Sequence, residues 1–535
     1  MAHEYPSRRE RGAQLRGGRR VNVADLLRDS AEDFPSKPAL VFRGRPITYR
    51  DLDDRVDRTA AALARLGVGP GDRVALLAGN VPEFVSTLYG AMRAGAVVCP
   101  LNYALTAEEV GYILADAGAK VAVTEMASLP TLLAVSDRLA DLQTVMVIGG
   151  PPVPSRTISL EEAVATVAAP PDVATDDADL ALIAYTAGTT AAPRGAMLSH
   201  GNLRANLKQM SGVRDLAMTS KDVVLLALPL FHIYALNAIL GLAVKSGASA
   251  ILIDRFDARE TLELVAEHHI TALFGAPPMF SAWLALAQSN ERIPELASVR
   301  LAVSGAAPLS PKVLSAFRER FGIDIWEGYG LSECAPAVTS NAVGAKPKPG
   351  SIGLPIPGVE VRLVGEHGDE VEDGDPGEIL VRGPNVFGGY WRRPDASAEV
   401  FDDGWLRTGD VAYRDEDGYL FLVDRKKDLI IVSGFNVYPK EVEQAIEQHP
   451  SVAEAAVVGI PDERTGEAVQ AWIVPRQKGS VTAEQIIDFL HGYLARFKWP
   501  KDIRVVQELP HHVTGKVLRR ALRRGELLGA DEAPP

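Results

Sequence analysis

Cysteine is nearly absent from the sequence, since only Cys99 and Cys334 occur in 535 residues. Two cysteines cannot form the disulfide framework of a small secreted domain, and they fit a reducing cytoplasm. Neither stands in a CxxC or CxxH cluster, which argues against a structural zinc site. We therefore expect a cytoplasmic protein that is stabilised by its core.

An excess of positive charge is also lacking, because 56 Lys and Arg residues face 69 Asp and Glu residues and give a net charge of −13. General nucleic-acid binding depends on clustered basic residues, so a nucleic-acid partner is not expected. The first twenty residues are locally basic, and no apolar segment follows that could serve as a signal peptide. We interpret residues 1–20 as a solvated tail, and weak contact with anionic lipid is the alternative.

An uninterrupted membrane-spanning run is missing as well. Residues 223–244 are long enough to cross a bilayer, but Pro229, His232 and Asn237 interrupt them. Because Pro229 divides the run, we predict a buried strand, a loop and a helix, and no transmembrane segment.

Alternating strand and helix patterns fill the first four hundred residues. Thr48 can cap a helix whose apolar side chains share one face, from Leu52 to Leu66, and a strand follows at Arg73–Leu77. This alternation predicts largely parallel sheets with helices on their faces. The expected fold class is α/β, with a large N-terminal domain of doubly wound sheets.

Shorter alternating strands with Gly and Asp turns begin after about Gly350 and predict a more antiparallel β subdomain. A compact unit of about a hundred residues then starts near Lys427. Within it, Thr482 and Gln485 form a capping box for a helix that we expect to carry apolar residues as far as Phe497. The predicted domains are a tail (1–20), an N-terminal domain (21–426) and a small mobile α+β lid (427–535) with its hinge at Lys427.

The stretch YTAGTTAAPRGA, residues 185–196, is typical of a loop that binds phosphate. Small residues let backbone N–H groups approach an anion, and hydroxyl groups add donors. Six residues separate Gly188 from Gly195, and Ala196 and Met197 follow, so this is not a Walker A loop.

Further motifs follow in a fixed order, and together they are more specific than any one of them. They are LPLFHIY (228–234), SGAAPL (304–309), EGYGLSE (327–333), GWLRTGD (404–410), DRKKDLIIVSGFNVYPKEVE (424–443) and HHVTGKVLRR (511–520). With these motifs the chain resembles the acyl-adenylate-forming superfamily from about Val21 to Leu527. The stretch IIVSGFNVYPKEVE looks most like bacterial medium- and long-chain fatty acyl-CoA ligases.

The resemblance implies a two-step reaction that uses ATP, Mg²⁺ and coenzyme A. A carboxylate attacks the α-phosphorus of ATP, and the thiol of coenzyme A then attacks the acyl-AMP. A carboxylic acid is already ionised at pH 7, so catalysis consists of positioning and charge neutralisation. The resemblance is compatible with a homodimer and with weak peripheral contact of the protein with a membrane.

The resemblance also implies roles for individual residues around the nucleotide. Phosphate contacts are expected from Thr186, Gly188, Thr189, Thr190, Arg194 and Ser332. Adenine contacts are expected from Gly305, Ala306, Glu327, Gly328 and Tyr329, with Tyr329 stacked on the ring. Asp410 is expected to accept from the ribose hydroxyls with the help of Arg425, and Glu333 to hold Mg²⁺ together with Thr186.

The remaining roles concern the acyl group and the second step. His232 is expected beside the acyl carboxylate, and Lys516 is expected to reach the carboxylate and the α-phosphate during adenylation. Lys427 matches the hinge. The pantetheine channel is expected to be lined by Ser433, Gly434 and Phe435.

The phosphate loop departs from the family pattern at three positions, Ala187, Ala191 and Arg194. These changes remove a hydroxyl, add a Cβ where glycine had freedom, and replace a lysine by a bulkier planar cation. We expect an active enzyme, because the other charged motif residues are present. An inert acyl or nucleotide binder is the alternative from another class.

Two alternatives lie within the family. One is an acyl-AMP ligase that loads a carrier protein, but the insertion usual for such ligases is missing between Asp410 and Gly434. The other is an aryl-acid CoA ligase. The small residues Gly330, Ala335 and Ala337 favour a roomy acyl tunnel instead.

Overall fold

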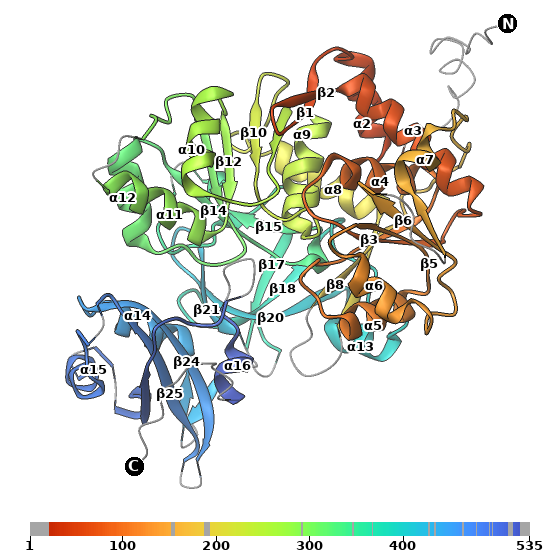
Figure 1. The fold of residues 1–535 in the computed structure, drawn as a ribbon. Coiled ribbons are helices and arrows are strands. Elements are labelled where there is room, and N and C mark those ends of the chain that lie inside the picture. Colours follow the sequence, from red (N-terminus) through yellow and green to blue (C-terminus); the bar gives the residue numbers. More distant parts are fainter. Residues whose placement is uncertain are drawn as a thin grey trace, which may run out of the picture.

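A computed structural model describes residues 21–150, 156–186, 193–289, 293–344, 347–365, 368–425, 428–432, 435–462, 465–477, 479–491, 493–494, 496–511 and 517–524. The chain forms a large N-terminal domain and a smaller C-terminal domain, drawn in blue below the larger body in Figure 1. The predicted α/β fold class is confirmed. The exact limits of the domains stay a prediction, and Lys427 lies outside the described residues.

A nine-stranded sheet forms one half of the N-terminal domain, in the order β16-β15-β14-β13-β12-β10-β11-β1-β2. The pairs from β1 through β11, β10, β12 and β13 to β14 are parallel, and the edges are antiparallel. Its strands are β1 (Pro38–Phe42), β2 (Arg45–Thr48), β10 (Val223–Leu226), β11 (Ser249–Leu252), β12 (Ala272–Gly275), β13 (Leu301–Ser304), β14 (Ile325–Gly330), β15 (Ala337–Ser340) and β16 (Leu354–Pro355).

A seven-stranded sheet forms the other half, in the order β7-β6-β5-β3-β4-β8-β9, and only the β8–β9 pair is antiparallel. Its strands are β3 (Arg73–Leu77), β4 (Val97–Pro100), β5 (Ala119–Glu125), β6 (Thr144–Ile148), β7 (Thr157–Ser159), β8 (Leu180–Thr186) and β9 (Arg194–Ser199). Alternate residues of β3 face different cores, because Val74 and Leu76 join the main core and Ala75 and Leu77 join a second one. Both faces of this sheet are therefore covered, as the alternation of strands and helices predicts.

Helices cover these sheets (Figure 1). They are α2 (Asp25–Asp33), α3 (Tyr49–Arg65), α4 (Pro82–Arg93), α5 (Ala107–Ala117), α6 (Leu129–Ser136), α7 (Leu160–Ala165), α8 (His200–Ser211), α9 (Leu242–Lys245), α10 (Ala258–Glu267), α11 (Pro277–Gln288), α12 (Pro311–Phe321) and α13 (Pro394–Val400), with short helices η1 (Tyr234–Gly241), η2 (Ser332–Cys334) and η3 (Asn341–Val343). The predicted cap is confirmed, since the Thr48 side chain accepts a hydrogen bond from the backbone N–H of Asp51 at the start of α3.

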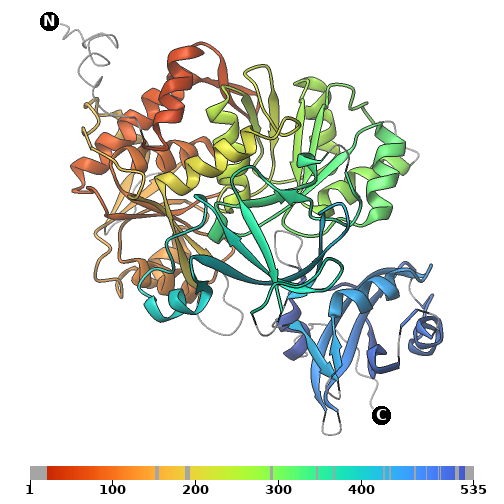
Figure 2. The ribbon, with the colours of Figure 1, turned by 180° about the vertical axis from the view of Figure 1, so that it is seen from behind.

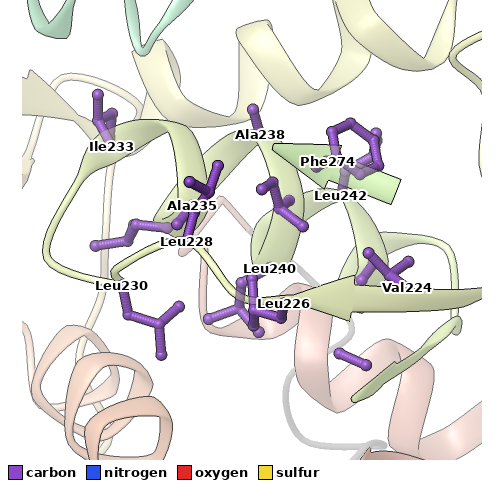
Figure 3. Close-up of a cluster of buried hydrophobic side chains, with 14 of the residues drawn as sticks. Val224, Leu226, Leu228, Leu230, Ile233, Ala235, Ala238, Leu240, Leu242 and Phe274 are labelled. Carbon is purple, nitrogen blue, oxygen red and sulfur yellow. The ribbon is translucent and has the colours of Figure 1, made fainter. Parts of the chain in front are cut away.

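The apolar run at residues 223–244 is buried in the core, as predicted (Figure 3). It forms β10, a loop, the π-helix η1 and α9, and the amide of Asn237 donates to the backbone oxygens of Leu203 and Ala335. These bonds satisfy the two N–H groups of the buried amide. Among the described residues, no helix combines the length and apolar character that a membrane crossing requires.

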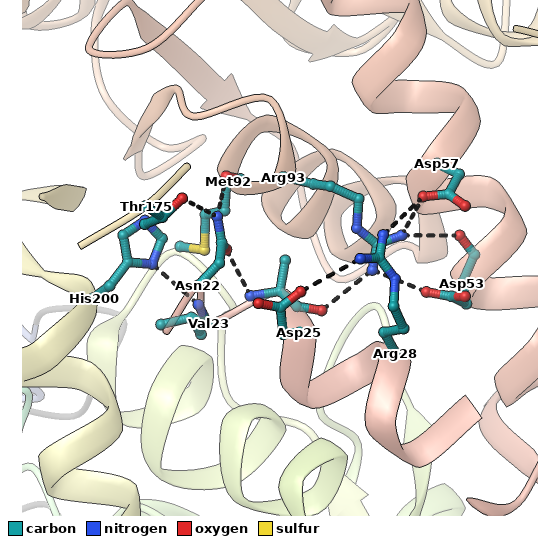
Figure 4. Close-up of polar contacts among 11 residues, drawn as sticks. Asn22, Val23, Asp25, Arg28, Asp53, Asp57, Met92, Arg93, Thr175 and His200 are labelled. Atoms are coloured by element: carbon teal, nitrogen blue, oxygen red, sulfur yellow. Dashed lines mark hydrogen bonds and ion pairs between the residues drawn. The ribbon is translucent and has the colours of Figure 1, made fainter. Parts of the chain in front are cut away.

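A buried ion cluster joins α3 and α4 (Figure 4). The guanidinium of Arg93 is 5% exposed and contacts Asp53 at 2.9 Å and Asp57 at 2.6 Å. Nearby, the backbone N–H of Val23 donates to Nδ1 of His200 at 3.1 Å. Burial lowers the pKa of His200 to about 4, so the ring is held neutral as an acceptor.

An antiparallel sheet follows the two large sheets, and Figure 2 shows it crossing the near side of the molecule. Its strands are β17 (Glu360–Val364), β18 (Gly377–Arg382), β19 (Phe401–Asp402), β20 (Trp405–Arg414) and β21 (Leu420–Arg425). The predicted β subdomain is confirmed.

The C-terminal domain contains a sheet with its own apolar core. Its elements are β22 (Ile430–Val432), β23 (Phe435–Val437), α14 (Pro439–Glu447), β24 (Val452–Asp462), β25 (Gly466–Pro475), α15 (Ala483–Leu490), η5 (Arg496–Lys498), β26 (Asp502–Val505) and α16 (Arg519–Arg524). The capping box of Thr482 and Gln485 is confirmed, but the prediction that this helix continues to Phe497 is wrong. The α-helix ends at Leu490, and Phe497 lies in η5.

Candidate nucleotide site

The phosphate-binding loop connects two strands of the seven-stranded sheet. Thr186 ends β8, Arg194 begins β9, and the two residues face each other in the ladder. The hydroxyl of Thr186 donates to the backbone oxygen of Arg194 at 3.4 Å. The residues between them that were assigned to phosphate, Gly188, Thr189 and Thr190, lie outside the described residues.

The second glycine of this loop is required by packing. A Cβ on Gly195 would lie 2.5 Å from Cγ2 of Ile183 and 3.1 Å from the ring of Tyr185. Only glycine fits so close to the neighbouring strand.

Tyr390, which belongs to none of the sequence motifs, connects this hairpin to the proposed metal ligand. The guanidinium carbon of Arg194 lies 5.6 Å from the centre of the Tyr390 ring, and the Tyr390 hydroxyl donates to Oε1 of Glu333 at 2.9 Å. Burial, and then the charge of Glu333, raises the pKa of Tyr390, so the hydroxyl stays a neutral donor. Tyr390 follows two glycines in an irregular segment, which gives no distinct sequence signal.

The two motifs assigned to adenine lie at the ends of neighbouring parallel strands. β13 runs beside β14, with Ser304 opposite Glu327, so Gly305 and Tyr329 follow at the same edge of the sheet. This is the edge where α/β sheets bind ligands. A Cβ on Gly305 would lie 3.0 Å from the ring of Tyr234, so the LPLFHIY motif packs here as well.

One residue in each of the two adenine motifs has a restricted backbone conformation. Ala306 has a φ of 70° although it carries a side chain, and it is exposed. A Cβ on Gly328 would lie 3.1 Å from the backbone oxygen of Thr339 on the paired strand β15. The chain at this edge therefore follows a path that few residues can adopt.

Glu327 joins the two adenine motifs. Its Oε1 accepts from the backbone N–H of Leu309 at 3.0 Å, and its Oε2 is buried. Burial raises the pKa of Glu327 to about 7, and the backbone N–H groups of Leu309 and Gly350 offset only part of that effect. The carboxyl group of Glu327 therefore exchanges its proton near neutral pH.

Asp410, in GWLRTGD, contacts Tyr329 of EGYGLSE and faces Arg425 of the charged motif that begins at Asp424. Its side chain is 7% exposed, and its Oδ2 accepts from the hydroxyl of Tyr329 at 2.7 Å. Arg425 faces Asp410 across the β20–β21 ladder, and its backbone alone is described. Burial and the charge of Asp410 raise the pKa of Tyr329, which keeps its hydroxyl a donor.

A cavity of 260 Å³ lies between the EGYGLSE and GWLRTGD motifs. It is lined by Leu331, Glu333, Glu378, Tyr390, Arg407 and Thr408, among others. Glu333 lines this cavity from η2, and Ser332 is its neighbour in the same helix; both side chains are half-buried. The cavity therefore brings the Glu333 carboxylate together with the hydroxyl groups of Tyr390 and Thr408.

The donor chemistry of Glu333 and Thr186 is compatible with a magnesium ion. Glu333 offers a carboxylate oxygen, and Thr186 offers a hydroxyl oxygen at the base of the loop; both are the hard oxygen donors that Mg²⁺ prefers. Within the described ranges, no group of three His, Cys, Asp or Glu residues could hold a metal by itself. Mg²⁺ bound with nucleotide phosphates usually needs only one or two protein carboxylates.

His232 lies in the turn between β10 and η1 and is half-buried. Its Nδ1 accepts from the backbone N–H of Tyr234 at 3.3 Å, which orients the ring. Because Tyr234 packs on Gly305, His232 belongs to the same edge of the site.

Two of the three small residues, Gly330 and Ala335, do not support the predicted acyl tunnel. A Cβ on Gly330 would lie 2.1 Å from the backbone oxygen of Pro336, and Ala335 is fully buried with a φ of 64°. Close backbone packing, rather than an open channel, explains why these two positions are small.

Besides the three loop residues Gly188, Thr189 and Thr190, four more residues with predicted roles lie outside the described residues: Lys427, Ser433, Gly434 and Lys516. Phe435 begins β23, and only its backbone is described. The structure therefore leaves the hinge, the pantetheine channel and the catalytic lysine as predictions.

Comparison with known proteins identifies relatives over nearly the whole chain. Residues 27–391 match the model of the family described as AMP-binding enzyme, and residues 441–516 match AMP-binding enzyme C-terminal domain. A long-chain-fatty-acid–CoA ligase of Yersinia pestis is 36% identical over 96% of this chain and 96% of its own. A feruloyl-CoA synthase of Amycolatopsis is 38% identical over 92% of this chain and 96% of its own. The crystal structure of ATP-bound MatB from Rhodopseudomonas palustris is similar with a TM-score of 0.86 and 35% identity, covering 94% of this chain and 98% of that one.

Proposed function

Since the chain belongs to the AMP-binding enzyme family and is an AMP-forming acid–thiol ligase, we propose that it activates a medium- or long-chain fatty acid with ATP and transfers the acyl group to coenzyme A. The observation that carries this proposal is the meeting of Tyr329 and Asp410 beside Glu333 at one edge of the large sheet. ATP and coenzyme A are substrates of the reaction, which releases pyrophosphate and then AMP.

The phosphate end of the site neutralises charge. Thr186 and Arg194 hold the base of the loop, and Gly188, Thr189 and Thr190 contribute donors to the β- and γ-phosphates. Mg²⁺, when bound by Glu333 and Thr186, supplies positive charge against the phosphates. Ser332 contacts the α-phosphate, and Lys516 contacts the carboxylate and the α-phosphate during the first step.

The nucleoside end of the site fixes the orientation of ATP. Gly305 and Ala306 form one wall for the adenine, and Glu327, Gly328 and Tyr329 form the other. Asp410 accepts from the ribose hydroxyls, and Arg425 supports it from the opposite strand. Because the acyl carboxylate and ATP are both anions, this fixed geometry supplies most of the catalysis.

The acyl end and the second step involve other residues. His232 lies beside the acyl carboxylate, and its orientation by the Tyr234 N–H supports this role. Lys427 acts as the hinge between the two half-reactions. Ser433, Gly434 and Phe435 line the path of the pantetheine arm.

The contacts of Arg194, one of the three altered residues of the loop, favour an active enzyme over an inactive one. Arg194 lies over the Tyr390 ring, a contact that suits a planar guanidinium better than a lysine ammonium. Arg194 keeps its positive charge at the base of the loop, where it can neutralise phosphate despite Ala187 and Ala191.

An aryl acid is the second candidate substrate, and the 38% identity to a feruloyl-CoA synthase favours it. Two buried free cysteines support a cytoplasmic location. A homodimer and a weak peripheral membrane contact remain predictions.

The test incubates purified protein and Mg²⁺-ATP with saturated fatty acids of increasing length and with cinnamate-type acids, with and without coenzyme A. Mass spectrometry then measures pyrophosphate and acyl products. We expect fatty acyl-CoA and pyrophosphate, both dependent on Glu333. Aryl-CoA would select the second candidate, and acyl-AMP that accumulates despite coenzyme A would indicate loading of a carrier protein.

A matched pair of variants controls this assay. Glu333→Gln should suppress pyrophosphate release, while Glu360→Gln, at an exposed pair with Arg382 in the β subdomain, should leave it unchanged. Silence of the wild type with every acid, followed by activity in the variant Ala187→Ser, Ala191→Gly, Arg194→Lys, would show that the natural loop disables the enzyme. Silence in both proteins would contradict the proposed function.

A further inference from the structure

The TGD tripeptide, residues 408–410, forms a bulge in the sheet of the β subdomain. In the β18–β20 ladder, Glu378 faces Val411 and Leu380 faces Arg407, so a single residue of β18, Ile379, lies opposite the whole tripeptide. Gly409 has a φ of 72°. Such a bulge redirects side chains and leaves backbone groups without ladder partners.

Side chains satisfy the backbone of this bulge. The Thr408 hydroxyl donates to the backbone oxygen of Ile379 at 2.8 Å and accepts from the backbone N–H of Asp410 at 3.1 Å. The backbone N–H of Gly409 donates to Oε1 of Glu378 at 3.3 Å. The shape of the bulge therefore depends on the Thr408 hydroxyl and on one carboxylate that belongs to the neighbouring strand.

Glu378 is itself held in place. Its Oε2 accepts from Arg407 at 2.8 Å, and the same guanidinium contacts Asp402 at 3.0 Å. The Glu378 side chain is 7% exposed, while that of Arg407 is 27% exposed. A buried carboxylate with a charged donor on one oxygen and a backbone donor on the other has little freedom to move.

We propose that Glu378 is a positioning residue for the nucleotide site, because it fixes the bulge that directs the carboxylate of Asp410 toward the ribose. Glu378 acts through the backbone N–H of Gly409. The Tyr329 hydroxyl holds Oδ2 of Asp410 from the other side, so the bulge and Tyr329 together determine where the carboxylate lies. This inference rests on the proposed ribose contact of Asp410, and it adds a residue that no motif assigned to the site.

The test measures how strongly the full-length protein prefers AMP to 2′,3′-dideoxy-AMP in equilibrium binding, which requires no acid substrate. Hydrogen bonds from two hydroxyls to a carboxylate should give the wild type a preference of roughly 10- to 100-fold. Glu378→Ala should reduce that preference to less than about threefold, because Asp410 is no longer held in line with the ribose. Glu378→Gln keeps an acceptor for the Gly409 N–H and loses the ion pair, so it should lie between the two.

Controls separate positioning from general damage. Asp410→Asn calibrates the loss of the ribose contact, and Glu360→Ala removes an exposed ion pair of the same sheet and should leave the preference unchanged. If Glu378→Ala does not fold, Glu378→Gln decides the matter, with an expected loss of at least about threefold in the preference. Weaker binding of both nucleotides with the preference retained would overturn the inference.

The outcome can be separated from that of the proposed function. A wild type that forms acyl-CoA but shows no preference for AMP over the dideoxy analogue would overturn the ribose contact and the role of Glu378, and would leave the ligase reaction intact. A wild type that prefers AMP, loses the preference in Glu378→Ala and activates no acid would support the inference and contradict the proposed function.

Discussion

Glu327→Gln should change how the stability of the protein depends on pH. Glu327 is 7% exposed, and burial raises its pKa to about 7 from the usual 4.5. Its Oε1 accepts from the Leu309 N–H, and glutamine offers a carbonyl oxygen for the same bond. The substitution therefore removes a titration and preserves the contact between the two adenine motifs.

The size of the effect follows from the raised pKa. The folded protein keeps a proton on Glu327 up to about pH 7, whereas the unfolded chain releases it near pH 4.5. Because the folded state binds more protons, this stabilisation is complete below pH 4.5 and is lost as the pH rises through 7. At 1.36 kcal/mol for each pKa unit, the wild type should lose roughly 2–3 kcal/mol between pH 5 and pH 8, and Glu327→Gln should not.

Thermal unfolding of both proteins from pH 5 to pH 8.5 measures this difference. For an unfolding unit of about 400 residues, 2.5 kcal/mol corresponds to about 3 °C in Tm. The difference in Tm between variant and wild type should therefore move by about 3 °C in favour of the variant as the pH rises. A difference in Tm that is the same at pH 5 and pH 8 would refute the assignment of a raised pKa to this carboxyl group.

Three further perturbations test other parts of the structure. Glu333→Gln should lower the rate of pyrophosphate formation by roughly 10²–10³ and leave binding of AMP, which lacks the outer phosphates, nearly unchanged in calorimetry. Arg93→Met should cost about 3–5 kcal/mol in thermal unfolding because it removes the guanidinium that contacts the buried Asp53 carboxylate, whereas Arg138→Met, at an exposed pair, should cost under about 1 kcal/mol. Equal losses would contradict the buried cluster. The wild type should lose about 3 kcal/mol of unfolding free energy as the pH falls from 6.5 to 4, because a pKa of about 4 keeps the His200 ring neutral in the folded protein while the unfolded chain binds a proton. His200→Asn should remove this loss. The same loss in urea unfolding of the variant between pH 6.5 and pH 4 would refute the assignment.

Local sequence signals predicted the elements whose structure depends on nearby residues. The Thr48 cap, the strand Arg73–Leu77 and the capping box of Thr482 and Gln485 all appear in the structure. Each of these elements depends on interactions between residues a few positions apart, so the local sequence pattern is enough to predict it. The same holds for the buried strand and helix at residues 223–244, although the π-helical form of η1 has no periodic signal.

The residues of the site that were not predicted from the sequence, Tyr390 and Glu378, depend on contacts between distant segments. Tyr390 reaches Glu333 from a loop 57 positions away, and Glu378 reaches Gly409 across a ladder whose bulge no single strand reveals. The end of α15 at Leu490 was also missed, because apolar spacing continues past it. Motif order therefore located the nucleotide site, while strand register and packing determine how its residues are held.

The most direct test of the central claim follows oxygen atoms through the reaction. Incubation of the protein with Mg²⁺-ATP, coenzyme A and a fatty acid labelled with ¹⁸O in its carboxylate should yield AMP that carries one ¹⁸O, because the carboxylate oxygen forms the bond to the α-phosphorus and stays on AMP when the thiol attacks. Mass spectrometry of AMP reads the label. Unlabelled AMP, or ADP and phosphate in place of AMP and pyrophosphate, would contradict an acyl-adenylate mechanism at this site.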